Sequence, residues 1–207
     1  MLSAVFSAAI LFSDATDPIQ AAIDYYEKVT AYQVSLRSTS GGRSEVIRYY
    51  FKKPGYVRME FLRPFRGAVL VYSPVTKRAK LWPFGYRSFP SLTLSADNSL
   101  IQSSTGQRID RSDVGVLYHN VKALQEHGRT QIVGMESVGG QKALHVTVEG
   151  NGGFSVGSIS RYQLWLDQTT GFPLKGFTYG VGGRLIEIVE TGELKITADL
   201  PDDLFNK

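Results

Sequence analysis

The chain has 207 residues, of which 43% are hydrophobic and 20% charged, and its formal net charge is +4. This composition is ordinary for a soluble globular protein and argues against a disordered chain or an integral membrane protein. A chain of this length can bury one good core, and no linker rich in Pro, Ser and Gly divides it, so we expect one domain.

The charge is unevenly distributed along the chain. Twelve basic and two acidic residues lie between Ala31 and Pro90, whereas the rest of the chain carries 11 basic and 17 acidic residues. Such a one-sided field could steer the protein to anionic lipid headgroups or to an acidic partner. The alternative is a solvated face balanced by the acidic C-terminal strands. We do not expect nucleic-acid binding, because the basic residues alternate with apolar ones in predicted strands.

The N-terminal run Met1–Phe12 is apolar but too short to span a bilayer. With Ser13-Asp14-Ala15 as a small-x-small cleavage site, it predicts a signal-peptide remnant over residues 1–16, although no Lys or Arg precedes the run. The alternative is an ordered helix of the mature protein. We therefore expect an exported protein whose single domain covers residues 17–207.

A first helix is predicted from Pro18 to Ala31, with Asp17 as N-cap and proline at the first helical position. The apolar positions that recur at helical spacing are Ala22, Tyr25 or Tyr26, and Val29.

From Tyr32 onward the apolar period changes to two, which is typical of strands. A hairpin with a Gly41-Gly42 turn leads to the stretch Tyr49–Trp82, which predicts three consecutive strands joined by Pro/Gly turns. Three apolar side chains of its first strand share one face, and the run 68–72 is almost continuously apolar. The three are Val57, Met59 and Phe61.

Two motifs in this stretch resemble the LolA-type periplasmic lipoprotein carriers. They are FKKPGYVRME over Phe51–Glu60 and the turn Val71–Pro74, which match that family's basic pair before a proline, its Arg-containing strand and its later Y-x-P turn. The resemblance extends to residues 25–32, 162–167 and 170–174. It implies a periplasmic protein with a half-barrel fold that carries lipid.

A second helix is predicted after the polar segment Pro90–Asp110, which we interpret as a strand fragment and a loop. Ser112 or Asp113 caps it and Gly128 ends it. Its apolar positions are Val114, Leu117, Val121 and Leu124. In the resembled family this inserted helix is a lid over the lipid site, and the alternative is a simple packing helix.

Five further strands are predicted before a pinned C-terminal tail, giving about ten or eleven strands in meander order. They cover Thr130–Met135, Lys142–Glu149, Ile159–Asp167, Phe172–Val181 and Leu185–Ile196. The predicted fold is mainly β (α+β), with a large curved antiparallel sheet forming an incomplete barrel, an N-terminal helix and an inserted lid helix.

No catalytic, metal or cofactor site is predicted. The G-x-S-x-G match at Gly153–Gly157 lacks the strand before it and the helix after it that a hydrolase elbow needs, and no histidine follows it in the chain. His119, His127 and His145 lack metal-ligand spacing, and the absence of cysteine excludes thiolate chemistry. We interpret the glycine-rich match as a loop between strands.

The favoured function is that of a non-enzymatic, monomeric carrier that shelters acyl chains of a lipoprotein or another lipid, with membrane-bound donor and acceptor proteins as possible partners. Each buried methylene contributes roughly 0.8 kcal/mol. The predicted lining comprises Val57, Met59, Phe61, Val69, Val71, Leu81, Leu117, Val121, Leu164 and Leu166. The same residues would merely form a core if the barrel were filled.

Lys53 stands where the resembled carriers have an arginine that ties the sheet to the lid helix and governs opening. Because lysine lacks the planar guanidinium fork, we expect the lid to be held mainly by apolar contacts from Leu117 and Val121. The alternative function is an envelope sensor or interaction module of the same fold that binds a protein partner. The predicted contacts to a partner or to lipid headgroups are Arg58, Arg63 and Arg66.

Overall fold

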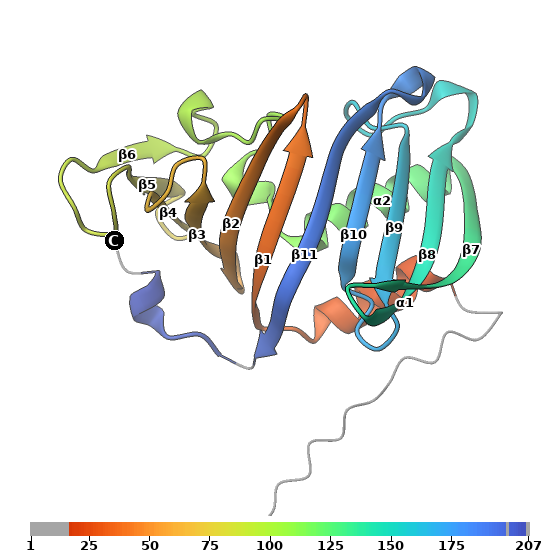
Figure 1. Ribbon diagram of the computed structural model, residues 1–207, viewed down its shortest axis with the longest axis horizontal. Helices are drawn as coiled ribbons and strands as arrows, with labels where there is room; N and C mark the ends of the chain where they lie inside the picture. The colour runs from red at the N-terminus through yellow and green to blue at the C-terminus, as the bar shows by residue number, and fades with distance from the viewer. Residues whose placement is uncertain (1–16, 198, 206–207) are drawn as a thin grey trace, which may run out of the picture.

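The computed structural model describes residues 17–197 and 199–205, which form one antiparallel sheet of eleven strands and two α-helices (Figure 1). Helix α1 spans Pro18–Glu27 and helix α2 spans Val114–Glu126. The strands are β1 (Ala31–Ser40), β2 (Arg43–Lys52), β3 (Tyr56–Arg63), β4 (Val69–Ser73), β5 (Arg78–Trp82), β6 (Leu92–Ser95), β7 (Gly128–Val138), β8 (Gln141–Gly150), β9 (Arg161–Asp167), β10 (Pro173–Tyr179) and β11 (Leu185–Thr197). The predicted signal segment lies outside the described residues.

The strand order corrects the prediction of a single meander. The order is β6-β5-β4-β3-β2-β1-β11-β10-β9-β8-β7, so two meanders meet where β1 pairs with β11. Strands β6 and β7 therefore form the two edges of an open sheet, although α2 and its flanking loops join them in the chain. The predicted incomplete barrel, an antiparallel sheet that does not close, is confirmed together with its N-terminal and inserted helices.

Both helices lie on the same face of the sheet, which we call the inner face (Figure 1). Helix α1 ends at Glu27, four residues before the predicted end, and the chain then enters β1 at Ala31. Of the two candidate caps for α2, Asp113 is the N-cap, and its carboxylate accepts from the backbone N–H groups of Gly115 and Val116. No described helix is long and apolar enough to cross a membrane.

The outer face is also covered over β3–β5, by the C-terminal segment of residues 199–205. Leu200 and Phe205 are buried there against Val69, Val71 and Trp82. Lys52 Nζ holds the segment through the Leu200 carbonyl at 2.9 Å and the Asp199 and Asp202 carboxylates at 2.6 and 2.7 Å. The predicted pinned tail is therefore confirmed, and it explains why all five residues of β4 are buried.

Candidate binding site beneath the helices

An aromatic cluster fills the space between the helices and the centre of the sheet. Tyr32 on β1 lies 5.2 Å from Phe172 and 5.3 Å from Phe51, measured between ring centroids. Tyr26 on α1 lies 6.0 Å from Tyr118 on α2. Burial raises the pKa of Tyr32 and of Tyr118 well above the usual value, so both hydroxyls stay neutral hydrogen-bond groups. The inner face is thus packed as a core.

Helices α1 and α2, which we call the helix cover, are held by polar contacts at several points. Tyr26 Oη donates to Asp113 Oδ1 at 2.8 Å, and Lys122 Nζ forms an ion pair with Asp17 Oδ2 at 2.9 Å. Tyr118 Oη donates to the carbonyl oxygen of Gly171 at 2.7 Å, which ties α2 to the turn before β10. These contacts join the two helices to each other and to the sheet.

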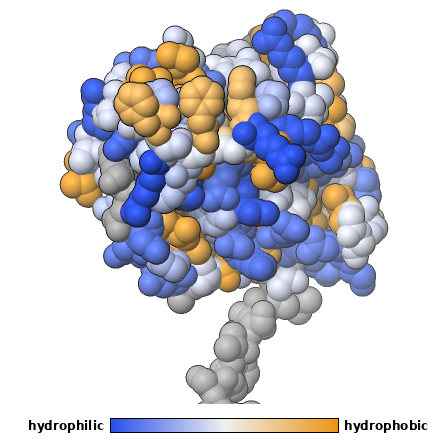
Figure 2. Space-filling model, turned by 60° about the vertical axis from the view of Figure 1, so that its left-hand side comes forward, coloured by the Kyte–Doolittle hydropathy of each residue, from blue (hydrophilic) through white to orange (hydrophobic). Residues whose placement is uncertain are grey.

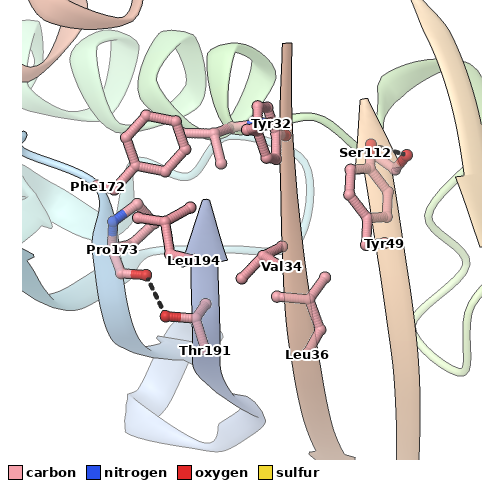
Figure 3. A pocket seen from close by; sticks show the side chains of 10 residues that line it. Tyr32, Val34, Leu36, Tyr49, Ser112, Phe172, Pro173, Thr191 and Leu194 are labelled. Atoms are coloured by element: carbon pink, nitrogen blue, oxygen red, sulfur yellow. Dashed lines mark hydrogen bonds between the residues drawn. The ribbon is translucent and has the colours of Figure 1, made fainter. Parts of the chain in front are cut away.

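A small cavity lies beneath the N-terminus of α2, between β1, β2, β10 and β11 (Figure 3). Its volume is about 40 Å³. Tyr49 and Ser112 face each other on one side, with their hydroxyl oxygens 3.0 Å apart, and the Thr191 hydroxyl donates to the Pro173 carbonyl on the other. The remaining lining residues are Tyr32, Val34, Leu36, Val114, Phe172 and Leu194. Ligand pockets typically measure about 300–1,000 Å³, so this cavity cannot hold an acyl chain while the cover is closed.

Eight of the ten predicted lipid-lining residues belong to the inner core, but none of them lines this cavity. The eight are Val57, Met59, Phe61, Leu81, Leu117, Val121, Leu164 and Leu166. The expectation that Val69 and Val71 share their face is wrong, because both point to the outer face and pack beneath Leu200 and Phe205. The residues that line this cavity are not among those predicted from the sequence. The alternation of Tyr32, Val34 and Leu36 along β1 is the pattern that places three of them on the inner face.

Lys53 ties the sheet to a helix, but the helix is α1 and not the inserted one. Its ammonium group donates to the carbonyl oxygens of Tyr26 at 3.2 Å and Glu27 at 2.7 Å. It also lies 5.2 Å from the centre of the Tyr26 ring. These carbonyls belong to the last turn of α1, where a cation is favourable. The expectation that Lys53 ties the sheet to the inserted helix is therefore wrong, because its contacts are with α1.

The three predicted partner-contacting arginines separate into two groups. Arg58 is buried, pairs with Glu60 Oε1 at 2.8 Å and donates to the Leu204 carbonyl at 3.0 Å, so it holds the C-terminal segment and is not exposed at the surface. Arg63 and Arg66 are exposed around the turn between β3 and β4. The C-terminal segment, which lies far away in the chain, covers Arg58 together with the Tyr86 ring, whose centre is 4.2 Å from the guanidinium carbon.

His145 takes part in a hydrogen-bonded contact between strands, and the G-x-S-x-G match lies in a connecting segment. His145 Nδ1 lies 2.8 Å from Glu136 Oε1, and the indole N–H of Trp165 donates to the other oxygen of the same carboxylate at 2.7 Å. Among the described residues, no group of three or more His, Asp or Glu side chains could hold a metal ion. The segment around Ser155 connects β8 and β9, so the prediction of a glycine-rich loop is confirmed.

Comparisons with known proteins place this fold. The family model of the MucB/RseB N-terminal domain matches residues 93–207, which is more than half of the chain. No curated protein sequence matches. The solved complex of MucA and MucB from Pseudomonas aeruginosa matches with a TM-score of 0.58 and 17% identity, and the match covers 94% of this chain but only 61% of that one.

Two other solved structures share the fold. A conserved protein of Thermus thermophilus has a TM-score of 0.56 at 14% identity, with 91% of this chain and 93% of that chain covered. The lipoprotein LppX of Mycobacterium tuberculosis has a TM-score of 0.53 at 11% identity, with 88% and 96% covered. The LolA-like resemblance is confirmed for the fold. By its family-model match, the chain belongs to the MucB/RseB N-terminal domain family.

Proposed function

We propose that this chain is a binding module of the bacterial cell envelope, without catalytic activity, whose ligand is an extended segment of another protein. The family match carries the proposal, because MucB was solved in complex with MucA. The packed inner face supports it, since a cavity of about 40 Å³ offers no ready chamber for a lipid. A periplasmic location and export by an N-terminal signal belong to the same proposal.

The edge strand β7 is the proposed contact surface for that segment. In the part of the chain that the structure describes, β7 pairs with β8 on one side and forms the end of the sheet. Ile132, Val133 and Met135 expose 51%, 49% and 49% of their surface there. An extended peptide can add to such an edge through backbone hydrogen bonds, with its side chains against the exposed apolar ones.

A bulge between Ile132 and Gly134 limits how such a segment would pair. The bulge interrupts the regular ladder, so a partner strand would align with either half of β7. The half that follows the bulge also carries Glu136, which His145 and Trp165 hold in place from β8 and β9. The half of β7 that follows the bulge is therefore held more firmly and is the better surface for pairing with a partner strand.

Isothermal titration calorimetry tests the proposal with the periplasmic segment of the MucA-type protein from the same organism. We expect a one-to-one complex, and the triple variant I132S/V133S/M135S lowers its affinity on the order of 100-fold because three apolar contacts are lost. The matched control is F65S/F84S/F89S, which removes three exposed apolar side chains elsewhere. Equal binding by wild type and the β7 variant would contradict a role for this edge.

A second candidate function is the shelter of an acyl chain or another apolar ligand. The apolar inner core beneath the helix cover favours this function. A small set of polar contacts fixes the cover, such as the hydrogen bonds from Tyr26 to the Asp113 carboxylate and from Lys53 to the backbone carbonyl of Glu27. Lipid entry would require the cover to move and would expose the eight predicted lining residues that belong to the inner core. Native mass spectrometry followed by organic extraction tests this function. A stoichiometric co-purifying lipid supports it, and a clean apo mass without uptake of added acyl ligand contradicts it.

A further inference from the structure

Two loops carry exposed phenylalanines at the same end of the sheet. Residues 64–68 connect β3 to β4, and residues 83–91 connect β5 to β6. Val69 at the start of β4 pairs with Trp82 at the end of β5, so both loops leave the sheet from one end. Figure 2, turned so that the β6 side comes forward, shows hydrophobic side chains gathered along the upper part of this face beside strongly hydrophilic ones.

The exposed fractions of these rings are unusually high. Phe65 exposes 65% of its surface, Phe84 75% and Phe89 94%. Leu62 and Leu92, at the strand ends next to the loops, expose 38% and 40%. A single exposed apolar residue needs no explanation, but several on neighbouring loops mark a contact surface.

The residues of these strands and loops carry charge of one sign, and the acidic C-terminal segment lies beside the second loop, where Tyr86 Oη donates to the Asp203 carbonyl at 3.3 Å. From Phe61 to Ala96 the sequence contains six basic residues and no Asp or Glu. Three of the arginines are exposed beside the phenylalanines: Arg63 at the end of β3, and Arg66 and Arg87 in the two loops. Segments that lie in a membrane interface combine Lys or Arg with Phe, Trp and Leu, and each Lys or Arg near an anionic leaflet adds to the attraction.

We propose that these two loops, which we call the phenylalanine loops, dock on the surface of an anionic phospholipid bilayer. The rings of Phe65, Phe84 and Phe89 enter the boundary between headgroups and acyl chains, and the arginines bind the lipid phosphates. Guanidinium groups suit this role because their planar donors match phosphate oxygens. The surface is independent of β7, so the chain can lie on a membrane while β7 binds a protein segment.

Co-sedimentation of the purified chain with vesicles tests the proposal. The vesicles contain either phosphatidylglycerol with phosphatidylethanolamine or phosphatidylcholine alone, each at low and high salt. We expect binding to the anionic vesicles that weakens with salt, and little binding to phosphatidylcholine. Failure of the wild type to bind anionic vesicles at low salt overturns the proposal.

Two triple variants separate the apolar and the electrostatic parts. R63Q/R66Q/R87Q is expected to weaken binding to the anionic vesicles by roughly 100-fold, from the contribution of each arginine near an anionic surface. F65S/F84S/F89S is expected to lose most of the binding that persists at high salt. The matched control I132S/V133S/M135S keeps wild-type binding, so loss of partner binding at β7 and loss of membrane binding are distinguishable.

The remaining outcomes are also decisive. Because all six replaced side chains are exposed, thermal unfolding of both triple variants should match that of the wild type. Unchanged vesicle binding by the phenylalanine variant overturns the proposal. Capture of an acidic protein by these loops, without vesicle binding, would assign the surface to a protein partner and also overturn it.

Discussion

The hydroxyl group of Tyr26 on α1 donates a hydrogen bond of 2.8 Å to Oδ1 of Asp113, the N-cap of α2. The same oxygen accepts from the backbone N–H of Gly115 at 2.8 Å, so one carboxylate both caps α2 and joins the two helices. Burial, together with the neighbouring Asp113 charge, raises the pKa of Tyr26. The phenol therefore remains protonated and donates throughout the physiological pH range.

Tyr26→Phe removes this hydrogen bond and keeps the buried ring. Hydrogen bonds to charged groups contribute roughly 1.5–3 kcal/mol, and we expect a loss of that size in the free energy of unfolding measured with urea. Tyr25→Phe on the same helix is the matched control, since Tyr25 is only half-buried. Equal stability of the two variants would show that the link between the helices contributes nothing.

Gly171 seats the turn before β10 directly against α1. Its φ is +70°, and an added Cβ would lie 2.9 Å from Cα of Ala22. Gly171→Ala should therefore cost the strain of a left-handed alanine, about 1–2 kcal/mol, and a further 1–3 kcal/mol for overpacking.

Gly182→Ala is the control for this prediction, because Gly182 has a φ of +79° and nothing within 4 Å of its added Cβ. Urea unfolding should show a larger loss for Gly171→Ala than for Gly182→Ala. If the two losses were equal, α1 would not be packed against the turn.

Arg58 should act as a stability residue and not as a partner contact. Arg58→Ala leaves Glu60 and the Leu204 carbonyl without their buried partner, and we expect a loss of roughly 3 kcal/mol in the free energy of unfolding. Arg63→Ala, which changes an exposed side chain, should stay within about 0.5 kcal/mol of the wild type. A stable Arg58→Ala protein with an intact C-terminal segment would refute this assignment.

Glu187 gives the fold a pH dependence of defined sign. Burial raises its pKa above the ordinary glutamate value, although the Ser38 hydroxyl opposes the shift, and burial with the Glu187 charge also raises the pKa of Glu45. The folded state therefore binds these protons more readily than the unfolded chain. Stability from this pair falls as pH rises from the ordinary glutamate pKa through the raised folded value.

Glu187→Gln should accordingly increase stability at neutral pH and have little effect at a pH below the ordinary glutamate pKa. Urea unfolding at the two pH values measures the difference, and Glu190→Gln on the same strand, where the side chain is exposed, serves as control. If Glu187→Gln were less stable than the wild type at neutral pH, the change in the free energy of unfolding would have the opposite sign, and the raised pKa of Glu187 would not destabilise the fold.

Most of the strands could be predicted because their signals are local. The hairpin around Gly41-Gly42 and the alternation of Val57, Met59 and Phe61 depend only on neighbours in the chain. The strand order could not be predicted this way, because the pairing of Tyr32 with Ile196 joins residues from opposite ends of the chain. That pairing also makes β1 central and places the cavity beside it.

The candidate site was harder to predict for a related reason. The run Ala68–Tyr72 is apolar at every position, so periodicity cannot tell which side chains face the helices. Leu70 and Tyr72 face inward, whereas Val69 and Val71 lie beneath the C-terminal segment. Arg58 likewise has the sequence pattern of a solvent-facing cation, and its contact with the distant C-terminal segment is not visible in that pattern.

The most direct test of the account is amide hydrogen exchange of the chain with and without the periplasmic MucA-type segment. If the segment adds to the sheet edge, the amides of Gly128–Val138 that face away from β8 should become protected, while those of the phenylalanine loops stay unchanged. Protection confined to other strands, or an unchanged β7, would contradict the claim that this edge binds the partner.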